Sequence, residues 1–78
     1  MRSLLDLIAG TLGVPPADVI DASEMSTIQK WDSPRHVILM TELEMNYGIE
    51  IAPDDMAAAT SGAKNRDLLK RHGLSAAD

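Results

Sequence analysis

The chain has 78 residues, 45% of them apolar, and a formal net charge of −5. This length fits one domain with a small core, and the apolar content is too high for a disordered chain of this charge. The absence of cysteine excludes disulfides, thiolate metal sites and a cysteine nucleophile. Residues 1–63 carry ten acidic and three basic residues. This acidic body argues against nucleic acid as a partner and suits docking onto basic protein surfaces.

No apolar run approaches the length that spans a membrane, and the first ten residues do not fit a signal peptide. The sequence therefore predicts a soluble, cytoplasmic, monomeric protein with a single domain over residues 1–78 and no membrane partner.

The first predicted helix begins at Ser3, where Ser3 and Asp6 resemble a capping box, and ends at Gly13. Residues 14–31 contain two adjacent prolines and many small polar residues, which predicts a long loop. Loops of this length are uncommon in small domains unless they are functional or pinned to the core. Apolar residues that could pin it are Val14, Val19, Ile20, Met25 and Ile28.

Three further helices follow the loop. The second runs from near Pro34 to Tyr47, with Gly48 in the position that stops a helix in the left-handed conformation. "APDDMAAAT" predicts a short third helix and "SGAKNRDLLKRHGL" a fourth, ended by Gly73. The predicted fold is an all-α bundle of four helices, with a long loop between the first two and a short third helix.

The second helix has two apolar stripes where a helix that only covers a core would have one. The first stripe predicts the core-facing side and contains Leu39, Met40, Leu43 and Tyr47, with His36 among them. The second stripe contains Pro34, Val37, Ile38, Thr41 and Met45, with Glu44 at its edge. Either the long loop folds over this second stripe, or the stripe is a partner surface that begins at Ser33.

Ser33 precedes a proline at the start of this helix. Proline disfavours the helical conformation in the residue before it and is well tolerated at the first helical position. The pattern therefore predicts that Ser33 is the N-cap and that Pro34 is the first helical residue. On this interpretation the Ser33 hydroxyl accepts a hydrogen bond from a first-turn amide, which alone gives it no function.

The stretch "WDSPRHVILMTELEMNYGIEI", residues 31–51, resembles the signature of acyl carrier proteins and their peptidyl-carrier relatives. These proteins have Asp-Ser-Leu at the start of their second helix, an apolar and acidic helix ending in an aromatic residue, and then Gly-Ile-Glu-Ile or similar. The resemblance spans nearly the whole chain, because "LGV" after the first helix, the long loop and the short acidic third helix also match.

The resemblance implies that Ser33 is the attachment site of 4′-phosphopantetheine, donated by coenzyme A through a phosphopantetheinyl transferase. It implies a carrier that presents an acyl thioester to acyl-loading and acyl-transfer enzymes, as in fatty acid or polyketide biosynthesis, and catalyses nothing itself. Asp32 matches the family's acidic residue that contacts the transferase. The predicted partner-binding residues are Asp32, Pro34, Val37, Ile38, Thr41, Glu44 and Met45.

The chain departs from the family pattern in two places. Pro34 stands where the family has leucine, and Arg35 and Ile38 stand where it has acidic residues, which predicts docking that is more apolar and less sensitive to salt. Polar or small residues replace apolar ones near the start of the fourth helix, which predicts a weakly packed or frayed first turn. These are Gly62, Asn65 and Arg66.

Three alternatives to an acyl carrier stay open. One is a peptidyl or aminoacyl carrier, and another is an unmodified helical interaction module that retains the fold. The third is a small hydrolase that uses Ser33 and His36, although no third group orients the histidine as a triad requires. Glu50, Asp54 and Asp55 have too few ligands for a dedicated metal site, so no metal is expected.

Overall fold

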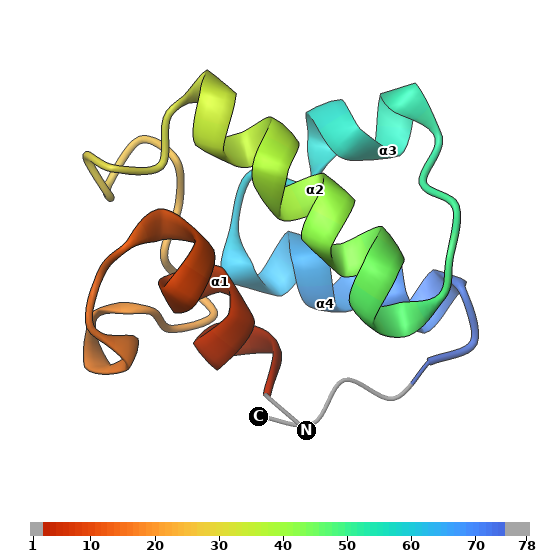
Figure 1. The fold of residues 1–78 in the computed structure, drawn as a ribbon, viewed down its shortest axis with the longest axis horizontal. Helices are drawn as coiled ribbons and strands as arrows, with labels where there is room; N and C mark the ends of the chain where they lie inside the picture. The colour runs from red at the N-terminus through yellow and green to blue at the C-terminus, as the bar shows by residue number, and fades with distance from the viewer. Residues whose placement is uncertain (1–2, 75–78) are drawn as a thin grey trace.

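Helical segments follow one another along the chain in the computed structural model, which describes residues 3–74 (Figure 1). They are α1 (Leu4–Leu12), the 3-10 turn η1 (Pro16–Asp18), α2 (Ser33–Tyr47), α3 (Pro53–Ala58) and α4 (Gly62–Arg71). Within residues 3–74 there is no strand, so the prediction of an all-α chain with four α-helices is confirmed there. None of the helices in this part of the chain is both long and apolar enough to cross a membrane.

The core lies between α1, α2 and α4. In Figure 1, α2 crosses the centre of the molecule, with α1 at the lower left and α3 at the upper right. Leu4 and Ile8 of α1, Leu39 and Leu43 of α2, and Leu68 of α4 are completely buried. These side chains are aliphatic and recur at helical spacing, so each of the three helices buries one apolar stripe in the core.

The ends of α1 and α2 follow local sequence signals. The Ser3 side chain accepts a hydrogen bond from the Asp6 amide at 3.1 Å, which caps α1. Gly13 and Gly48 end α1 and α2 with φ angles of 73° and 63°. Only glycine adopts this left-handed conformation without a steric penalty from Cβ. The predicted ends of these helices at Gly13 and Gly48 are confirmed.

The long loop between α1 and α2 is pinned to the core by most of the predicted residues. Val19 is buried, and Val14, Met25 and Ile28 are partly buried against the core. Ile20 is 57% exposed, so this candidate does not pin the loop. Adjacent residues in an extended segment point to opposite sides, and Val19 takes the inward position.

The first turn of α4 is held against this loop by backbone hydrogen bonds. The Gly62 amide donates to the Ser23 carbonyl at 2.9 Å, and the Ala63 amide donates to the Asp21 carbonyl at 2.8 Å. Gly62 is buried, and a Cβ on it would lie 2.6 Å from the Ile20 carbonyl oxygen. Glycine is therefore required by the close approach of two backbone segments.

Polar side chains complete the same junction. Asn65 is fully buried, and its Nδ2 donates to the carbonyls of Ala59 at 3.1 Å and Ser61 at 2.8 Å. Arg66 donates to both carboxylate oxygens of Asp21, at 2.7 and 3.1 Å. These hydrogen bonds hold the pKa of the Asp21 carboxyl below its usual value. The predicted fraying of this turn is wrong, because hydrogen bonds replace apolar packing there.

Candidate functional site

Trp31 positions the segment that leads into α2. Its indole is 2% exposed, and its amide donates to the Ile28 carbonyl at 2.9 Å, which closes a turn at the end of the loop. The next two residues, Asp32 and Ser33, are exposed. A buried aromatic residue thus fixes the backbone directly before the candidate serine.

Asp32, and not Ser33, is the N-cap of α2. Asp32 has extended backbone angles, and its Oδ1 accepts a hydrogen bond from the Arg35 amide at 3.0 Å. Ser33 is the first residue of the helix and Pro34 follows it, so the prediction that Ser33 caps the helix is wrong. The restriction that proline places on the preceding residue disfavours a helical backbone without forbidding it. Aspartate caps as well as serine does, and Asp32 also gains an ion pair from this position.

The Ser33 hydroxyl consequently does not cap the helix. The residue is exposed, and within residues 3–74 no hydrogen bond to its hydroxyl is found. A serine that caps a helix has its oxygen committed to an amide, whereas Ser33 is an exposed residue whose oxygen is not committed in this way.

The charges and amides beside Ser33 are largely committed to one another. Arg35 Nη1 lies 2.8 Å from Asp32 Oδ2, and both side chains are more than 40% exposed. Pro34 has no amide hydrogen, the Arg35 amide donates to the Asp32 side chain, and the His36 amide donates to the Asp32 carbonyl at 2.8 Å. Few first-turn amides therefore remain for an anion attached to Ser33.

His36 is turned away from Ser33 and is bonded on both sides of its ring. Its Nδ1 accepts a hydrogen bond from the Trp31 indole N–H at 3.1 Å, and its Nε2 lies 2.7 Å from the Met56 carbonyl oxygen. Neither nitrogen remains to accept the Ser33 proton, which a serine nucleophile would require. This geometry speaks against the hydrolase alternative.

The second apolar stripe of α2 faces solvent. Val37 is 65% exposed, Ile38 53% and Met45 70%. Pro34 and Thr41 are exposed beside them. The interpretation that the long loop covers this stripe is therefore wrong.

Glu44, at the edge of the stripe, has a structural contact. Its carboxylate accepts a hydrogen bond from the Ile51 amide at 2.9 Å, which ties the segment after α2 back onto the helix. The Glu44 side chain is thus partly buried and fixed, in contrast to the free apolar side chains beside it.

No protein-family model matches this chain, and no curated protein matches it significantly. A function for the chain therefore rests on the chemistry of these residues and on the resemblance of its sequence pattern.

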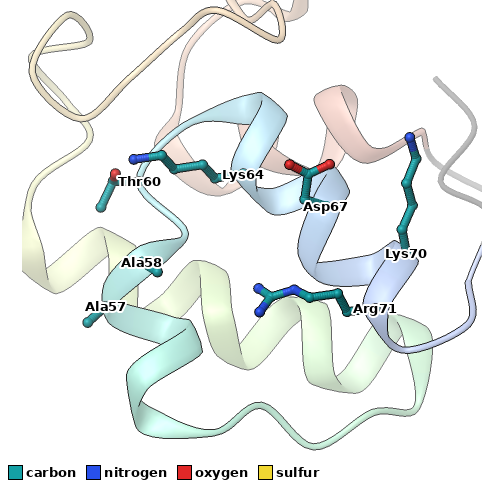
Figure 2. Close-up of a pocket in the computed structure, with 7 residues that line it drawn as sticks. All are labelled: Ala57, Ala58, Thr60, Lys64, Asp67, Lys70 and Arg71. Atoms are coloured by element: carbon teal, nitrogen blue, oxygen red, sulfur yellow. The ribbon is translucent and has the colours of Figure 1, made fainter.

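A hollow of about 570 Å³ lies between α3 and α4, away from the predicted site residues. Figure 2 shows Lys64 extending towards Thr60 and Arg71 reaching towards α3, where Arg71 Nη1 pairs with Asp55 at 3.1 Å. The sequence does not predict this hollow, because basic residues in the last turn of a helix are common whether or not a hollow lies beside them. The hollow is lined by Ala57, Ala58, Thr60, Lys64, Asp67, Lys70 and Arg71.

The acidic residues around α3 do not assemble a cation site. No group of three or more histidine, cysteine or acidic side chains that could hold a metal ion is found in the described part of the chain. Asp55, one of the three acidic residues named above in connection with a metal site, is instead paired with Arg71.

Proposed function

We propose that this chain is an acyl carrier protein whose Ser33 is modified with 4′-phosphopantetheine. The observation that carries the proposal is the Ser33 hydroxyl, which is exposed at the start of α2 and has no structural role because Asp32 caps the helix. The arrangement of four helices with a long loop after α1 and a short α3 supports the proposal, since the family's fold has these parts.

The proposed loading step forms one bond and breaks another. The Ser33 oxygen attacks the phosphorus that carries pantetheine in coenzyme A, the bond from that phosphorus to 3′,5′-ADP breaks, and the serine proton passes to a base. This chain supplies the hydroxyl but no free base beside it, because both ring nitrogens of His36 are engaged and both carboxylate oxygens of Asp32 bond to Arg35. The transferase must therefore supply the base, so Ser33 is a substrate group.

The bound arm would supply the thiol that this chain lacks. The sequence contains no cysteine, so a thioester on this protein needs a thiol from a cofactor.

Partner enzymes would dock on the exposed stripe of α2 that follows Ser33. Its side chains Val37, Ile38 and Met45 are more than half exposed and apolar. Contacts of this kind lose little affinity in salt, because salt screens charge pairs but not apolar contacts. We therefore propose docking that is less salt-dependent than that of a carrier with an acidic second helix.

The test is the intact mass of the purified protein after incubation with coenzyme A and a transferase of broad specificity. We expect the wild type to gain one phosphopantetheine, and Ser33→Ala to gain none while keeping its helical circular dichroism spectrum. Ser26→Ala is the matched control, because Ser26 is an exposed serine of the loop whose hydroxyl donates to the nearby Glu24 carboxylate at 3.2 Å. A wild-type mass that does not change, or a Ser33→Ala protein that is still modified, would overturn the proposal.

The second candidate is an unmodified interaction module with the same fold. The observation that favours it is the Asp32–Arg35 pair, which occupies the acidic side chain that a transferase would contact. An unchanged mass together with a partner bound through the apolar stripe would support this alternative. If the protein is loaded, transfer from an acyl donor or from an aminoacyl adenylate separates an acyl carrier from a peptidyl or aminoacyl carrier.

A further inference from the structure

α3 is a short helix that depends on its neighbours to stay in place. α3 has six residues, and none of its side chains is buried. Ala52 at its N-cap position offers no side-chain hydrogen bond. A helix this short is not stable alone in water. Contacts from neighbouring elements must therefore hold α3 in place.

His36 of α2 makes one of these contacts, and its two hydrogen bonds assign its tautomer. The Trp31 indole N–H can only donate, so His36 Nδ1, 3.1 Å away, must accept. In the neutral ring the proton then lies on Nε2, which donates to the Met56 carbonyl oxygen at 2.7 Å. Both bonds are satisfied together only in this neutral tautomer.

The Met56 carbonyl belongs to the last turn of α3, where carbonyls lack amide partners within the helix. The Ala59 amide reaches it only weakly, at 3.4 Å, and bonds better to Asp55 at 3.1 Å. His36 therefore satisfies an acceptor at the end of α3 from a position one turn into α2. Trp31, 2% exposed, holds the ring from the other side.

We infer that His36 is a positioning residue, which fixes α3 relative to the end of α2 that carries Ser33. The path runs from the buried indole before α2, through a histidine three residues after Ser33, to a backbone carbonyl of α3. Losing the histidine would leave α3 held by Met56, which is partly buried against the core, and by the ion pair between Asp55 and Arg71, which is partly exposed and so contributes little.

The consequence for Ser33 rests on the proposed function. An enzyme that acts on Ser33 covers the surface around the start of α2, and a loosened α3 would change that surface without touching the hydroxyl. We therefore expect His36 to affect recognition of the protein, measured as KM, and to leave the chemical step, measured as kcat, unchanged.

The first experiment does not need the modification. Nitrogen-15 NMR of the histidine rings should show His36 with its proton on Nε2, and amide hydrogen exchange should be measured along the chain. In His36→Leu we expect the protected amides of α3 to exchange about tenfold faster and those of α1 to stay unchanged. His36→Gln, which keeps one acceptor and one donor, should recover part of the protection. Trp31→Phe, which removes the indole donor, should weaken the hold on the ring.

Two results would overturn the inference. One is a proton on Nδ1 in the wild type, which can be seen even if a variant fails to fold. The other is unchanged exchange of the α3 amides in a folded His36→Leu protein.

Loading of the same variants then tests the link to Ser33. We expect a raised KM and an unchanged kcat for His36→Leu, with partial recovery in His36→Gln. An unchanged KM in a loaded His36→Leu protein would overturn that link. Failure of the wild type to be loaded would instead refute the proposed function and leave the exchange result standing.

Discussion

Replacing Asp32 and Ser33 separately tests the division of roles at the start of α2. Asp32→Ala removes the cap bond to the Arg35 amide, and losing such a cap costs about 0.5–2 kcal/mol of unfolding free energy. The same change removes the ion pair between Asp32 and Arg35. The Arg35 side chain is 43% exposed and the Asp32 side chain 46%, so this loss adds at most about 1 kcal/mol. In contrast, Ser33→Ala removes an exposed hydroxyl that bonds to nothing within residues 3–74, and we expect a change within about 0.5 kcal/mol.

The assay is urea unfolding at neutral pH, followed by circular dichroism. A loss of about 1 kcal/mol lowers the Tm of a domain of this size by about 4–8 °C, so thermal unfolding gives a second measurement. Asp32→Asn is the matched control, because asparagine caps as well as aspartate but cannot form the ion pair. It should therefore lie between the wild type and Asp32→Ala.

The opposite order of stabilities would refute this reasoning. If Ser33→Ala loses more than about 1 kcal/mol and Asp32→Ala loses none, Ser33 caps the helix after all. The Ser33 hydroxyl would then have a structural role, and the observation that carries the proposed function would be lost.

Other contacts give four further predictions. Gly62→Ala should lose about 1–3 kcal/mol in urea, because the new Cβ would lie 2.6 Å from a loop carbonyl oxygen, and unchanged stability would show that the loop yields there. Asp21 has a lowered pKa in the folded state, so its ionised carboxylate stabilises the fold above about pH 4, and this contribution is lost as the pH falls through the folded pKa. Asp21→Asn should therefore show a smaller loss of stability on acidification than the wild type, and identical profiles would contradict a role for the pair with Arg66. Ile38→Glu should change stability by less than about 0.5 kcal/mol, because Ile38 is 53% exposed, and a loss of several kcal/mol would mean that it is buried. Pro34→Leu should speed loading by a transferase of broad specificity, because leucine is the family's exposed contact there, and equal rates would leave Pro34 as a helix-start residue only.

Features set by neighbouring residues could be predicted from the sequence. The cap at Ser3 and the left-handed ends at Gly13 and Gly48 depend on backbone and side-chain groups within a few positions, and the structure has all three. The stripe that includes Val37 and Ile38 followed from helical periodicity alone, and it is exposed as one of the two interpretations required.

Features set by distant residues could not be predicted. Gly62 departs from the pattern of the carrier proteins that the sequence resembles. Glycine is needed there because the Ile20 carbonyl, 42 positions earlier in the chain, leaves no room for a Cβ. The hydrogen bond from His36 to Met56 spans 20 positions in the same way. For Gly62 and for His36, the residue is explained by a backbone carbonyl that only the folded chain brings close.

The start of α2 lies between these two classes, because it offers two adjacent caps and local rules do not choose between them. Aspartate and serine cap about equally well, so the outcome depends on what else each side chain can bond. Asp32 reaches both the amide and the guanidinium of Arg35, whereas serine has no charge to offer the guanidinium. Arg35, which departs from the acidic pattern of the family, therefore helps to select Asp32 as the cap. By doing so it leaves Ser33 exposed at the start of α2, which is the position that the proposed modification requires.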